Sequence, residues 1–326
     1  MRLVLIGDLH FYRLWVAPWR LFNKRVLALT NLWLNRRWNF DPALLATVIA
    51  RAVALRPDMV LGSGDLSSTS LEAEFADAAA ALRPLLDGRP ALIVPGNHDR
   101  YTHAAARERV AEQSLPDVVP ARLPVLRRLN AQWWLLALDS ARPRLLTARG
   151  RIGAAQLAEA RGLMQRLGPG QNLVVLCHYP PVVPPGAHDG SGHRLDDAAE
   201  LCNLLRQFPG HVLFLHGHIH HPWCWPAAPA GLERVVMVNA GAPARKSTEY
   251  PRGQGFWEIE LSDQPDTPAR LWHHWPTACA AGGTQQAVRP STGGQAASGT
   301  GADGWVVQPH LSSGAPALDY QPHSAD

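Results

Sequence analysis

Short runs of consecutive apolar residues recur along the chain, and five of them lead directly into Asp, Asn or His. A run of this length, bounded by turn residues, predicts a buried β-strand. Polar side chains just beyond such strands lie where α/β proteins hold their ligands. The runs cover residues 3–6, 59–61, 91–94, 173–176 and 212–215, and the polar residues after them are Asp8, His10, Asp65, Asn97, His98, Asp99, His178, His218 and His220.

Apolar residues at helical spacing predict helices between these strands. One begins at Asp41, a good N-cap residue, followed by Pro42, whose fixed φ suits the first turn. This alternation predicts an α/β fold, a four-layer αββα sandwich of two mixed β-sheets flanked by helices. The expected helices are 43–55, 71–86, 153–167 and 195–208, with helical pieces between 101 and 129, and the further strands are 132–138, 234–238, 255–261 and 270–275.

The composition changes near residue 282, where Gly, Ser, Thr, Gln and Ala replace most large apolar residues. Such a segment cannot bury enough apolar surface to offset its chain entropy, so we expect disorder there. Trp305 and the two valines after it are the exception to this composition. We therefore expect one folded domain over 1–276 and a low-complexity tail over 277–326.

The 326 residues are 46% hydrophobic and 18% charged, which suits one large domain with an ample core. The formal net charge of +4 is mild and does not argue for a nucleic-acid partner. The 4 cysteines have no CxxC spacing, so they fit neither a disulfide framework nor a zinc-thiolate site. Without a secretory signal, or the roughly 18 apolar residues that a spanning helix needs, the chain is expected to be cytoplasmic.

Residues 11–40 form a long insertion directly after His10, and this insertion is basic and rich in Trp. Its composition is typical of an amphipathic helix at a membrane interface. We expect a cap that contacts a membrane peripherally or holds an acyl chain; the alternative is that its apolar face packs on the domain. Phe22, Val26, Leu29 and Trp33 share one helix face, and the basic residues are Arg13, Arg20, Lys24, Arg25, Arg36 and Arg37.

The polar residues after the strands have the chemistry of metal ligands. Carboxylates, imidazoles and an amide oxygen together suit Mn, Fe or Zn. A pair of such ions, about 3.5–4 Å apart, needs one bridging carboxylate. In Asp8-x-His10 and His218-x-His220, the spacing lets both side chains of a pair point the same way from an extended segment.

The chain resembles the calcineurin-like metallophosphoesterases, whose blocks D-x-H, G-D, G-N-H-D/E, H and G-H-x-H occur here in order. The matched span runs from about residue 2 to about residue 261. The resemblance implies two divalent metal ions, among which we favour Mn, with Asp65 as the bridge. It implies that one ion is held by Asp8, His10, Asp65 and His220, and the other by Asp65, Asn97, His178 and His218.

The resemblance also implies the catalytic groups. His98 would be the acid near the leaving-group oxygen, and Asp99 is a candidate to orient it. The nucleophile would be a metal-bound hydroxide that attacks phosphorus in line. Asp139 also follows a strand but has no place in the ligand set, so we expect it in a structural turn.

These expectations describe a dinuclear metal-dependent hydrolase of a phosphodiester, phosphomonoester or pyrophosphate. The insertion suggests a lipid-linked substrate, as in related enzymes that hydrolyse UDP-diacylglucosamine, and a nucleotide is the other small substrate we consider. One alternative is a cyclic-nucleotide phosphodiesterase-like enzyme. Another is a non-catalytic scaffold with the same fold, although scaffolds of this kind usually lose ligands and the set here is complete. The sequence indicates no specific nucleic-acid partner.

Overall fold

The computed structural model describes residues 1–13, 40–187, 189–245, 254–264, 267, 269–276, 299–300 and 305–310. Residues 14–39 of the expected cap insertion, and most of the expected tail, lie outside this part of the chain. The predictions made for them, including the amphipathic helix and the disorder, therefore stay predictions.

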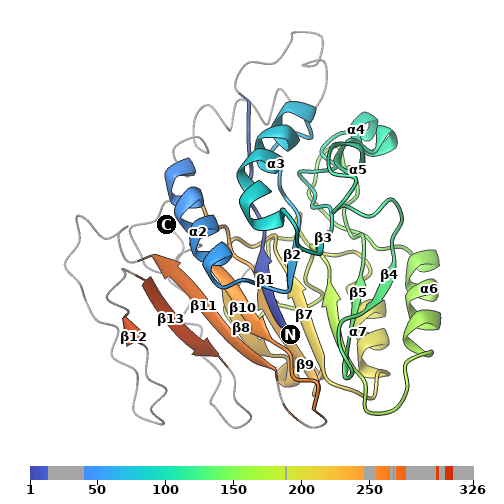
Figure 1. The fold of residues 1–326 in the computed structure, drawn as a ribbon. Helices are drawn as coiled ribbons and strands as arrows, with labels where there is room; N and C mark the ends of the chain where they lie inside the picture. The colour runs from blue at the N-terminus through green and yellow to red at the C-terminus, as the bar shows by residue number, and fades with distance from the viewer. Residues whose placement is uncertain are drawn as a thin grey trace.

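Two mixed β-sheets form the centre of the fold, as the sequence predicts (Figure 1). The first sheet has the order β12-β13-β11-β10-β1-β2-β3 and the second the order β4-β5-β6-β7-β9-β8. The first sheet consists of β1 (Arg2–Ile6), β2 (Met59–Gly62), β3 (Ala91–Ile93), β10 (Phe256–Glu260), β11 (Arg270–Pro276), β12 (Gly299–Thr300) and β13 (Trp305–His310). The second consists of β4 (Val125–Arg128), β5 (Trp133–Ala137), β6 (Asn172–Leu176), β7 (Val212–His216), β8 (Trp223–Pro226) and β9 (Val235–Asn239).

Parallel strands form the heart of each sheet, and antiparallel strands extend the edges. β1, β2 and β3 are parallel, and so are β5, β6, β7 and β9. Because the carboxyl ends of parallel strands meet at one edge of a sheet, the loops after β1, β2, β3, β6 and β7 can converge. These are the loops that carry the predicted site residues.

Helices cover the two outer faces, so the fold is the four-layer sandwich that the sequence predicts. α2 and α3 pack on the first sheet, and α6 and α7 pack on the second (Figure 1). A third apolar cluster, with Leu5, Leu61, Leu176 and Trp257 in it, lies between the sheets. The helices are α2 (Pro42–Ala54), α3 (Glu72–Leu86), α4 (His103–Glu108), α5 (Val110–Ser114), α6 (Ala154–Met164) and α7 (Ala198–Arg206), with a 3-10 turn at Ala228–Ala230.

The start of α2 confirms the capping prediction made from the sequence. Asp41 is the N-cap, and its carboxylate accepts a hydrogen bond of 2.9 Å from the Ala43 amide. Pro42 is the first helical residue, where its missing amide donor costs nothing. The apolar side of the helix, with Leu45, Val48 and Ile49, is buried against the first sheet.

The structure differs from the sequence-based expectation near residue 300. Composition predicts a disordered tail over 277–326, but Gly299–Thr300 and Trp305–His310 form strands, and the latter pairs antiparallel with β11. The Trp-Val-Val sequence at 305–307 has high β propensity, which explains why this piece can add to the sheet edge. Among the described helices, none is long and apolar enough to cross a bilayer.

Candidate metal centre

The structure brings all seven predicted ligand residues to the facing ends of the two sheets. Asp8 and His10 follow β1, Asp65 follows β2 and Asn97 follows β3. The second sheet contributes the three residues that follow β6 and β7, namely His178, His218 and His220.

Hydrogen bonds across the sheets hold the two groups of loops together. The His218 amide donates to a carboxylate oxygen of Asp8 at 3.0 Å, and Nδ1 of His178 donates to the Ser63 carbonyl at 2.7 Å. Each bond joins a loop of the second sheet to a loop of the first, so these bonds hold the two sets of loops in fixed positions at the site.

Glycines next to the ligands leave the space that the carboxylates occupy. A Cβ atom on Gly96 would collide with Asp65, and a Cβ on Gly217 would collide with Asp8 and with Oγ of Ser63. Glycine is therefore required at these positions by the close approach of neighbouring groups. The G-N-H-D and G-H-x-H blocks have a packing role as well as a chemical one.

The backbone of the ligand loops is strained. Asp8, His10, Asp65, His218 and His220 all have positive φ angles, of 52°, 50°, 54°, 74° and 63°. This conformation is uncommon for residues other than glycine, and it persists where the surrounding structure imposes it. Strain at several predicted ligands is the pattern expected of a functional site.

The first group of ligand atoms is compact, and three of its four residues are buried, with His220 half-buried. One ligand atom from each of Asp8, His10, Asp65 and His220 lies within 4.8 Å of the others. Nε2 of His10 is 2.8 Å from Nε2 of His220 and 3.7 Å from Oδ2 of Asp65. Nε2 of His220 is 3.6 Å from Oδ1 of Asp8. Two carboxylates and two imidazoles in this geometry suit a divalent cation.

The second group shares a carboxylate with the first. Oδ2 of Asp65 lies 3.4 Å from Nε2 of His178. Oδ1 of Asn97 lies 3.1 Å from Nε2 of His178 and 3.0 Å from Nδ1 of His218. One oxygen of Asp65 therefore faces a histidine of each group, which is the position a bridging ligand needs.

Burial makes these carboxylates costly without a cation. Burial raises the pKa of Asp8 well above its ordinary value, and the nearby Asp65 charge adds to this effect. Burial also acts to raise the pKa of Asp65, but His178 and His98 outweigh it and hold that pKa well below its ordinary value. The residues thus fit a divalent metal by donor type, by proximity and by electrostatic need.

Backbone carbonyls orient two of the histidines. Because the Ser63 carbonyl can only accept, Nδ1 of His178 carries the proton of that bond, and Nε2 is the atom turned toward Asp65 and Asn97. In the same way Nε2 of His218 donates to the His193 carbonyl at 2.9 Å, which leaves Nδ1 facing Asn97. Outer contacts of this kind set which nitrogen can bind a metal.

His98 lies beside the first group and is half-buried. Its amide donates to Oδ1 of Asp65 at 2.8 Å, and its Nδ1 donates to the Ser68 carbonyl at 2.8 Å. The ring stacks on Tyr101 with a centroid distance of 5.6 Å and lies 4.8 Å from the His10 ring. Since Nδ1 is held by a carbonyl, Nε2 is the nitrogen that can exchange a proton with a bound molecule.

The Asp99 carboxylate holds the loop backbone together. Oδ1 accepts from the amide and hydroxyl of Ser67 at 2.9 and 3.0 Å, and Oδ2 accepts from the Gly96 amide at 2.9 Å. Burial raises its pKa to about 6. The orientation of His98 by Asp99 stays a prediction; the hydrogen bond described above for the His98 ring joins it to Ser68.

Sequence reasoning missed the residues that support His98. The Ser70 hydroxyl donates to the His98 carbonyl at 2.7 Å and accepts from the Tyr101 amide at 2.6 Å. Together with Ser68 and Ser67 it belongs to a run of small hydroxyl residues just after Asp65. That run is the sequence feature that could have identified these residues, because buried hydroxyl groups need hydrogen-bond partners.

Comparison with known proteins agrees with this geometry. The family model for calcineurin-like phosphoesterases matches residues 1–222. A 3′,5′-cyclic adenosine monophosphate phosphodiesterase of Escherichia coli (strain K12) is 28% identical over 177 residues, which cover 51% of this chain and 58% of that protein. A probable cyclic nucleotide phosphodiesterase of Synechococcus sp. (strain WH7803) is 26% identical over 218 residues, covering 64% of this chain and 75% of that protein.

Solved structures show the same fold. A dimetal phosphatase from Danio rerio superposes with a TM-score of 0.55 at 13% identity, covering 83% of this chain and 94% of that one. A purple acid phosphatase from yellow lupin seeds superposes with a TM-score of 0.56 at 14% identity, covering 84% and 51%. At these identities the likeness concerns the fold alone.

Proposed function

The chain belongs to the calcineurin-like phosphoesterase family, and from this premise we propose that it is a hydrolase that cleaves a phosphodiester bond with two divalent metal ions. The observation that carries the proposal is the position of Asp65, whose Oδ2 atom faces His10 on one side and His178 on the other. A carboxylate in that position can bridge two ions, whereas a single ion would need only one of the two groups.

Each ion would have its own set of ligands, as the family resemblance implies. Asp65 belongs to both sets. Asp8, His10 and His220 complete the first, and Asn97, His178 and His218 complete the second. When bound, the ions would supply Lewis-acid activation of the phosphoryl group and of the attacking water.

The side chains around the ions would do the remaining work. His98 would protonate the leaving oxygen through Nε2, because its Nδ1 is held by the Ser68 carbonyl. The stacked Tyr101 ring would keep the imidazole in that orientation. Asp99 would brace the loop through Ser67 and Gly96, and so keep Asn97 and His98 in place.

The proposed substrate is a small phosphodiester, and a cyclic nucleotide is the first candidate. Two relatives carry the names of cyclic nucleotide phosphodiesterases, which supports this candidate. The chain aligns with only 58% of the length of the Escherichia coli relative, so the substrate of the whole protein is part of the proposal.

Manganese is the proposed metal, and the cytoplasm the proposed location. Carboxylate oxygens and imidazoles are suitable ligands for Mn, and also for Fe or Zn. They are less suitable for a metal that prefers thiolates. Cys177 stands next to His178, but burial raises the pKa of its thiol to about 12, so it would not offer a thiolate.

Peripheral contact with a membrane is a second proposal, and it rests on two features. The basic, Trp-rich composition of residues 11–40 is typical of an interfacial segment. In the described residues, the exposed large hydrophobic side chains are Leu145 and Leu146, at 68% and 89%, with Arg142, Arg144 and Arg149 close in sequence. Co-sedimentation with anionic liposomes, with and without residues 11–40, tests this proposal; equal sedimentation would remove the role of the insertion.

Hydrolysis of bis(p-nitrophenyl) phosphate, measured with metal content, tests the main proposal. We expect Mn²⁺-dependent turnover that is lost in Asp65→Asn, together with bound metal. The matched control is Asp117→Asn, which removes an exposed carboxylate elsewhere and should change neither quantity. Full turnover in Asp65→Asn, or after complete metal removal, would refute the proposal.

A further inference from the structure

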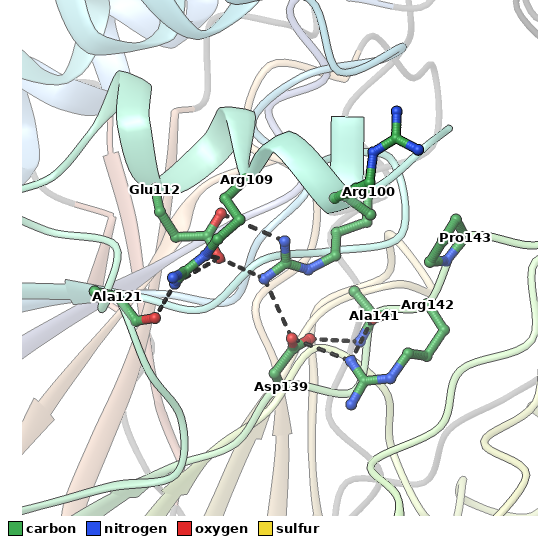
Figure 2. A pocket seen from close by; sticks show the side chains of 10 residues that line it. Arg100, Arg109, Glu112, Ala121, Asp139, Ala141, Arg142 and Pro143 are labelled. Atoms are coloured by element: carbon green, nitrogen blue, oxygen red, sulfur yellow. Dashed lines mark hydrogen bonds and ion pairs between the residues drawn. The ribbon is translucent and has the colours of Figure 1, made fainter. Parts of the chain in front are cut away.

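A polar pocket lies outside the candidate metal centre, between the short helices α4 and α5 and the loop that follows β5 (Figure 2). Its volume is about 400 Å³, which is within the usual range for small-molecule sites. None of the predicted metal ligands lines it. The lining residues are Arg100, Ala106, Arg107, Arg109, Glu112, Ala121, Asp139, Ala141, Arg142 and Pro143.

Positive charge exceeds negative charge on the cavity wall. The lining includes four arginines and two carboxylates, Glu112 and Asp139. Glu108, beyond the lining, lies 3.9 Å from Arg107, but both of these side chains are largely exposed, so their attraction is weak. The four arginines outnumber the two carboxylates of the lining, which favours an anionic ligand.

Two guanidinium groups meet on one carboxylate oxygen. Oδ2 of Asp139 is 3.2 Å from Arg100 and 3.1 Å from Arg142 (Figure 2). Arg100 is also held by Glu112, whose Oε1 lies 2.7 Å away. Arg142 is fixed further by the carbonyls of Ala141 and Ile152, at 2.7 and 2.9 Å. The two cations are therefore preorganised side by side with a single shared anion between them.

Spare donors remain on these arginines. A guanidinium has five N–H donors. The hydrogen bonds of Arg100 go from its two terminal nitrogens to Glu112 and Asp139, and they leave Nε and part of the terminal capacity for another acceptor. Arg107, whose side chain is 81% exposed, adds an exposed cation at the cavity wall. Paired arginine forks of this kind match the oxygens of a phosphate group.

Arg109, which also lines the cavity, has an uncommon backbone conformation. Arg109 links α4 to α5 in the left-handed conformation, with φ 57° and ψ 46°. Its guanidinium contacts Glu112 at 3.4 Å and also donates to the Ala121 carbonyl. This conformation is uncommon for a residue other than glycine, and the contacts with Glu112 and Ala121 hold Arg109 in it at the cavity wall.

We propose that this cavity binds a phosphate group, as free inorganic phosphate or as the phosphate of a small monoester. Arg100 and Arg142 would form the fixed part of the site, and Arg107 would close over the ligand. The small side chains of Ala106, Ala121 and Ala141 leave room for an organic group attached to the phosphate. This site is additional to the proposed metal centre and does not depend on the proposed hydrolysis.

Isothermal titration with inorganic phosphate and, separately, with adenosine 5′-monophosphate tests the proposal on the full chain. The titrations use Asp65→Asn, in which the metal centre should no longer bind phosphate. We expect one saturable equivalent of phosphate, with affinity that falls as salt is raised. Tighter binding of the monophosphate would show that the organic group also contacts the cavity, and equal binding would show that the phosphate alone is recognised.

Arginine variants in the same background locate the site. Arg107→Met and Arg142→Lys should each weaken phosphate binding about tenfold, the loss expected from about 1.4 kcal/mol of charge-assisted hydrogen bonding. Arg107→Met removes an exposed side chain, so it should fold normally, and Arg142→Lys keeps the charge but loses the fork. The control is Arg83→Met, an arginine of α3 that is 77% exposed and distant in sequence from the cavity.

The parent chain provides the remaining readout. Arg107→Met in the parent chain should leave hydrolysis of bis(p-nitrophenyl) phosphate unchanged, while phosphate binding at one of two sites weakens about tenfold. Absence of saturable phosphate binding in Asp65→Asn, or binding that Arg107→Met and Arg142→Lys leave unaltered, would overturn the proposal.

Discussion

Replacement of His98 by alanine tests its proposed role as the proton donor at the metal centre. The His98 amide donates to Asp65, so the variant keeps that bond to the proposed bridging carboxylate. The ring is held by the Ser68 carbonyl through Nδ1, which aims proton exchange at Nε2. His98→Ala should therefore retain bound metal and lose the acid.

The size of the effect depends on the leaving group. General acid catalysis is worth about 10²–10⁴ in rate, or about 2.7–5.5 kcal/mol of transition-state stabilisation. An alkoxide leaving group, such as a ribose oxygen of a cyclic nucleotide, needs the whole of this assistance. A nitrophenolate is stable as an anion and needs little of it, so the loss on bis(p-nitrophenyl) phosphate should be much smaller.

The assay compares the rates of hydrolysis of a cyclic nucleotide and of bis(p-nitrophenyl) phosphate by each protein, and the metal content of each protein is measured as well. His211→Ala is the matched control, because His211 is exposed and lies just before β7, away from the ligand loops. Equal losses on both substrates, or no loss on the alkyl phosphodiester, would refute the role assigned to His98.

Three further outcomes are expected. Gly217→Ala should weaken metal binding about 10–100-fold without unfolding the chain, because its Cβ would press on Asp8, and metal titration measures this. Glu112→Gln should lower the free energy of unfolding by about 1–3 kcal/mol at neutral pH. Burial acts to raise the pKa of Glu112, but Arg100 outweighs it and holds that pKa below the ordinary 4.5, so this stabilisation is present above the ordinary value and lost as pH falls through the lowered one. Urea unfolding, measured at neutral pH and at a pH below the lowered pKa, should show that the free energies of unfolding of parent and variant converge in acid. Glu108→Gln, at an exposed position, is the control. Chelation should abolish hydrolysis, and Mn²⁺ should restore it; activity that survives chelation would contradict a metal mechanism.

The layered fold could be predicted because its parallel strands are continuous apolar runs, buried on both faces. β6 and β7 are examples, and each ends at a predicted ligand loop. The seven ligand residues could be predicted because each follows such a run and because the family blocks occur in order. Their convergence required the structure, since no local pattern places His178 beside Asp65.

Edge strands could not be predicted in the same way. β4 has the sequence VLRR and is half exposed, so its pattern does not distinguish it from a loop. β8 begins just after a proline and ends in another, which argues locally against a strand. Each is held by antiparallel pairing with the next strand along the chain, β4 with β5 and β8 with β9, and such pairing leaves little local signal.

The supporting polar contacts were also hidden from sequence reasoning. Ser68 is one of several small hydroxyl residues after Asp65, and nothing local distinguishes it as the partner of His98. Asp139 was expected in a structural turn; its carboxylate does accept from the Ala141 amide at 2.9 Å, but it also joins Arg100 to Arg142. Arg142 lies 3 residues after Asp139, whereas Arg100 lies 39 residues before it, so only the fold brings Arg100 to this carboxylate.

A crystal structure with anomalous scattering data, collected on the chain loaded with Mn²⁺, would show whether two metal ions share Asp65. We expect two anomalous peaks about 3.5–4 Å apart, one on each side of Asp65, with the first beside His10 and the second beside His178. A single peak, or peaks that Asp65 does not join, would contradict this expectation.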